Sequence, residues 1–309
     1  MNYNKININF IKNDIIYYKK KYIFVLSFMG GFVMEKVRIA LCQMMVVADK
    51  KENLDRAEKM IYDAADKGAK IVSLPEMFNC PYDNKRFREY AETFPQGETI
   101  KMLSNAAKEK NIYLVGGSIP ELDDQGKVYN TSFIFDNKGN LIGKHRKMHL
   151  FDIDIKDRVS FKESEVLTGG KDVTIVDTEY GKIGVAICYD IRFPELVRIM
   201  ALKGAKLVFI PAAFNMTTGP AHWEILFKSR ALDNQIYVAG ISTARDINYS
   251  YVAYGNSIVV SPWGEVVSRL DEKEAILLED IDFDYINEVR ESLPLLKHRR
   301  EDVYKVSLL

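Results

Sequence analysis

The chain has 309 residues, of which 47% are hydrophobic and 28% charged, a profile typical of a globular protein and not of a disordered or collagen-like one. Lysine plus arginine and aspartate plus glutamate both number 43, so the formal net charge is zero and we expect no nucleic-acid partner. The three cysteines are far apart and odd in number, which excludes a disulfide framework and paired zinc knuckles and predicts reduced thiols in a cytoplasmic protein.

Residues 1–33 differ in composition from the rest of the chain, because Asn, Ile, Lys, Tyr and Phe dominate them. They predict a poorly ordered extension, or an upstream start codon with Met34 as the true first residue. A signal peptide is the alternative, although no small-x-small cleavage site follows the apolar run at residues 22–33. That run is too short to span a bilayer comfortably, so we predict no membrane partner.

From Val37 onward, short β-branched runs alternate with helical periods, which predicts an α/β protein. A helix is expected between the first two strands, with Gly68 at its end. The expected elements of this half are strands at residues 37–43, 71–74 and 112–115, a helix at 99–110, and a hairpin that pairs 132–135 with 141–144.

In the second half, residues 182–188 are predicted to form a strand, and a helix follows with Pro194 in its first turn and Gly204 beyond its end. The remaining expected elements are strands at 207–210, 237–241, 257–260 and 276–281 and a helix at 223–233. Cys188 therefore lies where a strand gives way to a helix. Such a turn exposes its side chain, and the amides that follow favour a thiolate and a developing oxyanion.

A lone cysteine is more commonly a small buried hydrophobe than a nucleophile, and Cys42 and Cys80 are assigned that structural role. The segment around Cys188 is more specific, since Gly184-Val-Ala-Ile-Cys-Tyr-Asp-Ile-Arg-Phe-Pro-Glu-Leu closely resembles the nucleophile motif of the nitrilase superfamily. Two further motifs appear in the family's order, namely Leu74-Pro-Glu-Met-Phe and His145-Arg-Lys-Met-His-Leu-Phe. The resemblance covers about residues 36–306, so residues 34–309 are predicted to form a carbon-nitrogen hydrolase domain.

The resemblance implies four catalytic residues: Glu76, Lys147, Cys188 and, in Phe161-Lys-Glu-Ser, Glu163. Amide hydrolysis needs a nucleophile, a proton carrier and positive charge facing the oxyanion, and these residue types supply them. Without the matched motifs, Glu76 and Lys147 would be read as ordinary solvated surface charges. The resemblance implies no cofactor and no metal.

The segments that begin at Phe78, Pro211 and Ser229 look most like the omega-amidase branch of the superfamily. That branch releases ammonia from monoamides of dicarboxylic acids, such as 2-oxoglutaramate and succinamate, so the substrate's free carboxylate also needs a binding group. Tyr82, Arg192 and Thr217 are the candidates.

Each of these assignments has an alternative. Arg192 could pair with Glu195 or Asp190, and Thr217 and Thr218 could cap the next helix. A deaminated-glutathione amidase or another small-amide or nitrile hydrolase is the alternative within the superfamily.

Three other classes stay open. A papain-like enzyme would use one of the histidines at 145, 149, 222 and 298 as its base. A metal site could form where His145, Lys147 and His149 alternate, together with Glu76 or Asp152. A small-molecule binding module on the same fold is the non-enzymatic alternative.

The resemblance also implies the architecture, a four-layer α-β-β-α sandwich of the nitrilase type, and at least a homodimer. Residues 293–306, which combine apolar side chains with Lys297-His-Arg-Arg, are expected to dock across that interface. Three short Asn-x-Ser/Thr patterns begin at Asn130, Asn215 and Asn248, and they would matter as glycosylation sites only in a secreted chain. The sequence does not fix the physiological amide, the size of any higher assembly or the role of residues 1–33.

Overall fold

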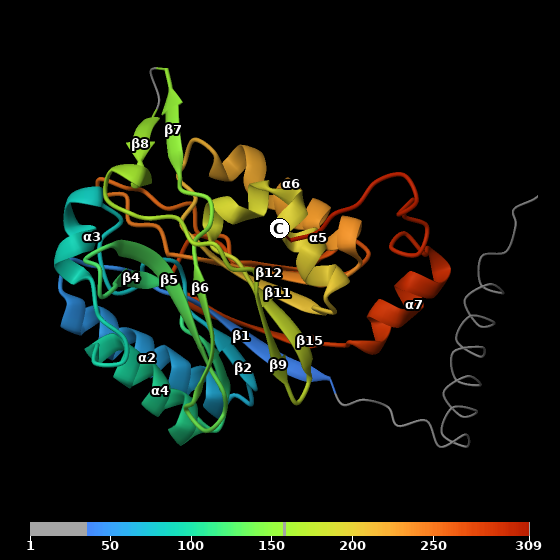
Figure 1. Cartoon of the computed structure of the whole chain (residues 1–309). Coiled ribbons are helices and arrows are strands. Elements are labelled where there is room, and N and C mark those ends of the chain that lie inside the picture. The colour runs from blue at the N-terminus through green and yellow to red at the C-terminus, as the bar shows by residue number, and fades with distance from the viewer. Residues whose placement is uncertain (1–35, 157–158, 309) are drawn as a thin grey trace, which may run out of the picture. The chain divides into compact units, whose positions relative to one another are not determined.

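The computed structural model describes residues 36–156 and 159–308, so the hypotheses about residues 1–33 lie outside it. Within these ranges, a seven-stranded and a six-stranded sheet carry helices on their outer faces, as Figure 1 shows. This arrangement confirms the expected α-β-β-α sandwich. No helix in the described ranges is long and apolar enough to cross a membrane.

The two sheets are mixed, and each contains a run of three parallel strands. The first sheet has the order β15 (Ala275–Ile281), β1 (Val37–Gln43), β2 (Ile71–Ser73), β3 (Tyr113–Val115), β5 (Val128–Phe135) and β4 (Ile119–Leu122), with β6 (Leu141–Arg146) also paired to β5. The second has the order β14 (Val266–Arg269), β13 (Ile258–Val260), β12 (Tyr237–Ser242), β11 (Leu207–Ala212), β10 (Gly181–Val185) and β9 (Thr174–Thr178). A separate two-stranded sheet is formed by β7 (Asp152–Ile155) and β8 (Val159–Lys162).

Helices cover the outer face of each sheet because their apolar sides pack on it. The helices over the first sheet are α2 (Lys50–Asp66) and α4 (Glu98–Lys110), and those over the second are α5 (Pro194–Leu202) and α6 (Gly219–Asn234). Two further helices are α3 (Asn84–Tyr90) and α7 (Asp284–Ser292). Asp49 begins α2 by accepting a hydrogen bond from the backbone N–H of Glu52 at 3.0 Å, and Gly68 after its end has a φ of 89°.

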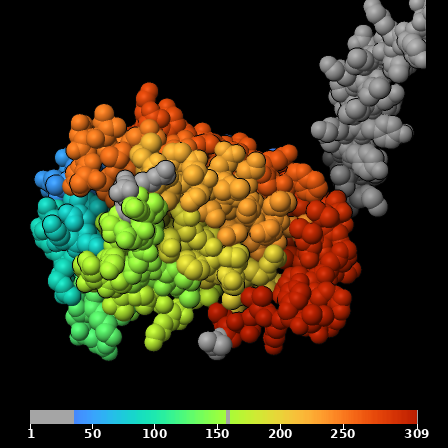
Figure 2. Space-filling view, turned by 90° about the horizontal axis from the view of Figure 1, so that it is seen from above, coloured from blue at the N-terminus to red at the C-terminus, as the bar shows by residue number. Residues whose placement is uncertain are grey.

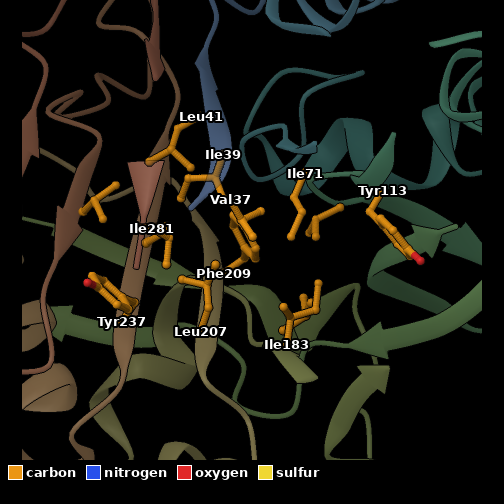
Figure 3. Close-up of a cluster of buried hydrophobic side chains, with 14 of the residues drawn as sticks. Val37, Ile39, Leu41, Ile71, Tyr113, Ile183, Leu207, Phe209, Tyr237 and Ile281 are labelled. Carbon is orange, nitrogen blue, oxygen red and sulfur yellow. The ribbon is translucent and has the colours of Figure 1, made fainter. Parts of the chain in front are cut away.

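Strand alternation builds the core between the two sheets. In β1, Ile39 and Leu41 point toward the second sheet, while Ala40 packs under the helices. In β11, Phe209 points toward the first sheet, while Val208 packs on the helix side. Figure 3 shows Ile39, Leu41 and Phe209 in this interlayer cluster. Because both faces of these strands are buried, their sequences are continuous runs of apolar residues.

Most of the elements expected from sequence are present within one to four residues at each end. One of these differences matters for the site, because the strand expected at residues 182–188 ends at Val185, three residues before Cys188, while α5 begins at Pro194 as expected. Between them lies a 3-10 helix, Cys188–Arg192. The elements that sequence patterns missed are α3, β4, β7, β8, β9, β14 and α7.

Candidate active site

Lys147 is a fully buried ammonium that lies between two fully buried carboxylates. Its Nζ is 2.9 Å from Glu76 Oε1 and 2.9 Å from Glu163 Oε1, and the three side chains have no solvent exposure. Glu76 follows β2, Lys147 follows β6, and Glu163 begins a 3-10 turn after β8. The ends of three separate strands thus bring together residues that are far apart in the sequence.

Cys188 completes this cluster from the second sheet. It is 5% exposed and has a φ of 45°, an uncommon left-handed conformation for a residue with a side chain. Its thiol interacts with the Glu76 carboxylate and with the backbone N–H of Ala213, the residue after β11. The structure therefore brings all four sequence-predicted catalytic residues into one buried cluster.

The pKa values in this cluster follow from burial and from an excess of carboxylate. Burial raises the pKa of Glu76, and the nearby Glu163 adds to the effect against the opposing attraction of Lys147. Burial lowers the pKa of Lys147, but Glu163 and Glu76 outweigh it, so the net shift is upward and the ammonium stays charged. Burial and the Glu76 carboxylate raise the pKa of the Cys188 thiol well above its usual value.

The raised thiol pKa contradicts the expectation that the turn alone favours a thiolate. A 3-10 turn separates Cys188 from α5, which begins at Pro194, so the end of the α-helix does not lie directly behind the thiol. The thiol must therefore lose its proton to a neighbouring base, and Glu76 is the carboxylate whose charge acts on it most strongly.

Asp190 ties the Cys188 turn to the segment that carries Lys147. Its carboxylate is 3.0 Å from Nε2 of His145 and 2.8 Å from Nδ1 of His149, and it accepts hydrogen bonds from the backbone N–H groups of His149 and Ile187. Burial opposes ionisation, but the hydrogen bonds from both histidines hold the pKa of Asp190 well below its usual range. One buried carboxylate thus fixes both halves of the site.

This network argues against the histidine-based alternatives. His145 and His149 flank Lys147 but bond to Asp190, and His222 bonds to Arg192, so none of the three contacts the Cys188 thiol as a base would. In the part of the chain that the structure describes, no group of three or more His, Cys, Asp or Glu side chains is arranged to hold a metal ion.

The three candidates for substrate binding have different surroundings. The Tyr82 hydroxyl is buried and lies 2.6 Å from Glu163 Oε1, so it belongs to the charged cluster itself. Arg192 is half-buried and pairs with neither Asp190 nor Glu195; its NH1 contacts His222 Nδ1 at 3.1 Å, and its buried Nε has no partner. Thr217 is half-buried beside α6 and donates its backbone N–H to Asn215 Oδ1. The N-cap residue of α6 is Thr218, whose side chain makes no capping hydrogen bond, so Thr217 is not the cap of this helix.

A pocket beside the charged cluster is lined by Glu76 and Tyr82 and, from the loop after β12, by Asp246, Tyr249 and Tyr251. The Tyr251 ring packs against the Tyr82 ring, with ring centroids 4.5 Å apart and the planes tilted by 31°. Seen from above in Figure 2, the yellow-green surface of the segments before and after Glu163 lies between the cyan of α3 and the gold of α6, while Glu163 itself is buried beneath the surface. Several segments of the chain therefore enclose the site.

Three residues of the site were not predicted from the sequence as functional residues. Asn130 entered it only as part of a sequon, Asp190 only as a partner for Arg192, and Tyr251 not at all. In the structure Asn130 bonds to Glu76, Asp190 bonds to two histidines, and Tyr251 forms part of the pocket wall. Polar residues within apolar strands are the pattern that could have indicated Asn130, because a buried amide needs a partner.

Comparisons with known proteins agree with this geometry. The carbon-nitrogen hydrolase model matches residues 38–291, and the chain belongs to that family. It is 54% identical to omega-amidase NIT2 of Xenopus tropicalis over 273 residues, covering 88% of this chain and 98% of that protein. It is 50% identical to omega-amidase NIT2 of Homo sapiens over 275 residues, covering 89% and 99%. The crystal structure of Saccharomyces cerevisiae Nit3, of branch 10 of the nitrilase superfamily, matches with a TM-score of 0.81 at 46% identity, covering 87% of this chain and 98% of that one.

Proposed function

We propose that this carbon-nitrogen hydrolase is an omega-amidase, which releases ammonia from the terminal amide of small dicarboxylic acid monoamides such as 2-oxoglutaramate and succinamate. The observation that carries the chemistry is the Lys147 ammonium held 2.9 Å from both Glu76 and Glu163 beside the Cys188 thiol. Identities of 50–54% to named omega-amidases over nearly their whole length support the substrate class.

In the first half of the reaction, Glu76 takes the thiol proton as the Cys188 sulfur attacks the amide carbon. The carbonyl oxygen becomes an oxyanion, which the Lys147 ammonium and the backbone N–H of Ala213 stabilise. Lys147 has three N–H groups and gives two of them to Glu76 and Glu163 at 2.9 Å each. The third reaches only the Tyr82 hydroxyl, at 3.5 Å, so it can turn to the substrate oxygen at little cost. The C–N bond then breaks, Glu76 returns the proton to the nitrogen, and ammonia leaves a thioester.

In the second half, Glu76 takes a proton from a water molecule as that water attacks the thioester. The C–S bond breaks, the carboxylic acid leaves, and the sulfur recovers its proton from Glu76. Glu163 holds Lys147 through Oε1, and its Oε2 accepts a hydrogen bond from the backbone N–H of Phe151 at 2.7 Å. Both carboxylates keep Lys147 charged throughout.

For the far end of the substrate, we assign the free carboxylate to Arg192, with Tyr82 and Thr217 nearby. Arg192 supports this because its guanidinium lacks a carboxylate partner and its buried Nε is unpaired. A buried donor without a partner is costly, and a substrate carboxylate would satisfy it with a charge-assisted bond. We expect Arg192→Gln to raise KM for succinamate at least about tenfold with a smaller change in kcat.

An ammonia-release panel tests the substrate class. Succinamate and 2-oxoglutaramate should be turned over faster than deaminated glutathione, the main alternative within the family. A preference for deaminated glutathione would overturn the omega-amidase assignment. Saturable binding of these amides without ammonia release would favour the binding-module alternative.

Alkylation tests the nucleophile separately. Iodoacetamide should modify Cys188 and abolish turnover, whereas Cys42 and Cys80, which are at most 1% exposed, should stay unmodified in the folded protein. Full inhibition by chelators with no effect of alkylation would contradict the thioester mechanism and support a metal site.

For assembly and location, we propose a cytoplasmic homodimer. All three cysteines are free thiols, as a reducing compartment requires. Helix α6 exposes large apolar side chains, with Ile225 62% and Leu232 41% exposed, and Trp263 beside them is 47% exposed. Residues 293–306 remain the candidate for docking across the interface. A monomer in light scattering at micromolar concentration would contradict the dimer.

A further inference from the structure

The two oxygens of the Glu76 carboxylate have different surroundings. Oε1 accepts a hydrogen bond from Lys147 Nζ at 2.9 Å and another from Asn130 Nδ2 at 2.9 Å, and the Tyr82 hydroxyl lies 3.3 Å away. Oε2 is equally buried but has no hydrogen-bond partner. The Tyr82 hydroxyl has one proton and lies closer to Glu163, so Lys147 and Asn130 are the two effective donors to Oε1.

Asn130 is built into the site through both its side chain and its backbone. It lies in β5, has no solvent exposure, and accepts the backbone N–H of Lys147 on its own carbonyl oxygen at 2.8 Å. The backbone of Asn130 therefore holds the lysine segment while its amide holds the glutamate. Full burial also rules out glycan attachment at Asn130 in this fold.

The neutral amide of Asn130 can bind one oxygen of Glu76 selectively, which a second cation beside the carboxylate would not do. It holds Oε1 and favours the ionised carboxylate without adding a positive charge that would bind Oε2 as well. With Lys147 as the sole donor, rotation about the last side-chain torsion could present either oxygen to the ammonium, because that torsion is broad and two-fold. Two donors on one oxygen fix which oxygen is left for proton transfer.

We propose that Asn130 is a positioning residue that fixes Oε1 of Glu76 and so assigns Oε2 as the oxygen that takes the Cys188 proton and returns it to the leaving ammonia. This rests on the proposed thioester mechanism. Asn130 itself touches neither the sulfur nor the substrate in this scheme, and its effect on the rate passes through Glu76.

The test compares Asn130→Asp and Asn130→Ala with the wild-type chain. Asp keeps the size of the side chain but replaces the amide donor with a second carboxylate, whose charge also raises the pKa of Glu76, whereas Ala removes the donor without adding a charge. Both variants keep the backbone carbonyl that holds Lys147. In a plot of kcat/KM for succinamate against pH, we expect the acid limb to move to higher pH by about one unit. The reason is that a lost hydrogen bond to a carboxylate raises its pKa. KM at pH values above the limb should stay within about twofold.

Site-resolved alkylation of Cys188 by iodoacetamide across the same pH range gives a readout that needs no amide substrate. Its acid limb should move in the same direction. If the wild-type chain releases no ammonia from any amide, the proposed function fails while alkylation still tests Asn130. If both variants keep wild-type acid limbs in both assays to within about 0.3 pH unit, the positioning role is overturned.

Asn79→Ala is the matched control. Asn79 is also a fully buried amide with one side-chain donor bond, to Thr99 Oγ1 at 3.3 Å, and an unpartnered Oδ1, but it does not contact Glu76. Its loss should lower the thermal midpoint and leave the acid limb unchanged. An equal shift of the acid limb in Asn79→Ala would mean that general loosening of the fold moves it, which would also overturn the proposal.

Discussion

Two buried glutamates, Glu76 and Glu121, contrast within the same part of the first sheet. Both oxygens of Glu121 are occupied: Oε1 by Lys144 and Arg146 at 2.9 Å each, and Oε2 by Arg146 at 2.8 Å and Thr131 at 2.7 Å. Glu76 has donors on one oxygen and none on the other. The first carboxylate is fully paired, and the second keeps an oxygen for chemistry.

The pKa values of the two carboxyls move in opposite directions for this reason. Burial raises the pKa of Glu121, but hydrogen bonds from Arg146, Thr131 and Lys144 outweigh it and the net shift is downward. Burial raises the pKa of Glu76, and the pairing with Lys147 is too small to reverse it because Glu163 shares that ammonium. Complete pairing gives a stable ion, whereas incomplete pairing gives a base poised to take a proton.

Successive residues of the same two segments make both arrangements. In β5, Asn130 bonds to Glu76 and the next residue, Thr131, bonds to Glu121. At the end of β6, Arg146 bonds to Glu121 and the next residue, Lys147, bonds to Glu76. Side chains alternate across a strand, so one pair of neighbouring segments supplies a structural ion cluster on one face and the catalytic cluster on the other.

The largest expected effect is loss of turnover when a residue of the Glu76 cluster is replaced. Glu76→Gln, Lys147→Met and Cys188→Ala should each reduce kcat/KM for succinamate about a thousandfold or more, because each removes the base, the oxyanion partner or the nucleophile. Circular dichroism should show a folded protein with a cooperative thermal transition. Activity within about tenfold of wild type in any variant would remove that residue's assigned role.

A smaller effect is expected at Asp190, another buried carboxylate of this region. Asp190→Ala leaves two imidazoles and two backbone N–H groups without their acceptor, and we expect it to lower the free energy of unfolding by about 3 kcal/mol. Urea unfolding measures this. Wild-type stability in the variant would show that water or a rearranged turn replaces the carboxylate.

Glu121→Gln should reduce stability and leave activity nearly unchanged, the converse of the effect expected for Glu76→Gln. We expect a loss of about 2 kcal/mol in the free energy of unfolding, below the usual range for broken buried pairs because Lys144 and Arg146 are 35% and 26% exposed and can regain water. The kcat/KM should stay within about threefold of wild type, since Glu121 does not contact the reacting groups. A large loss of activity with unchanged stability would contradict the division between the two carboxylates.

The sequence motifs predicted the four charged and nucleophilic residues that the structure brings together, and the strand and helix patterns predicted most of both sheets. They did not assign Asn130 to the site, because the expected strand began at residue 132 and a polar residue in a strand indicates a buried partner without showing which one. They also misjudged the environment of Cys188, since the 3-10 turn after it and the closeness of Glu76 are tertiary features. The short strands β9 and β14 were missed because their pairing partners, and not their own patterns, define them.

The smallest expected effect is a difference between the pH values at which Glu76 and Glu121 become protonated. The folded pKa of Glu121 is lowered from 4.5, so its stabilising contribution is present above pH 4.5 and is lost as pH falls through the lower folded value. The pKa of Glu76 is raised from 4.5, so the base becomes protonated at a higher pH, where Glu121 is still ionised.

Acidification from neutral pH should therefore abolish activity reversibly before the fold weakens, and the stability gap between wild type and Glu121→Gln should narrow only below pH 4.5. Succinamate kinetics and urea unfolding, measured on the same samples from about pH 2.5 to 8, check both statements. If activity and stability fell together along one acid limb, and Glu121→Gln shifted that limb, the loss of activity would be due to unfolding and Glu76 would not be the group that titrates.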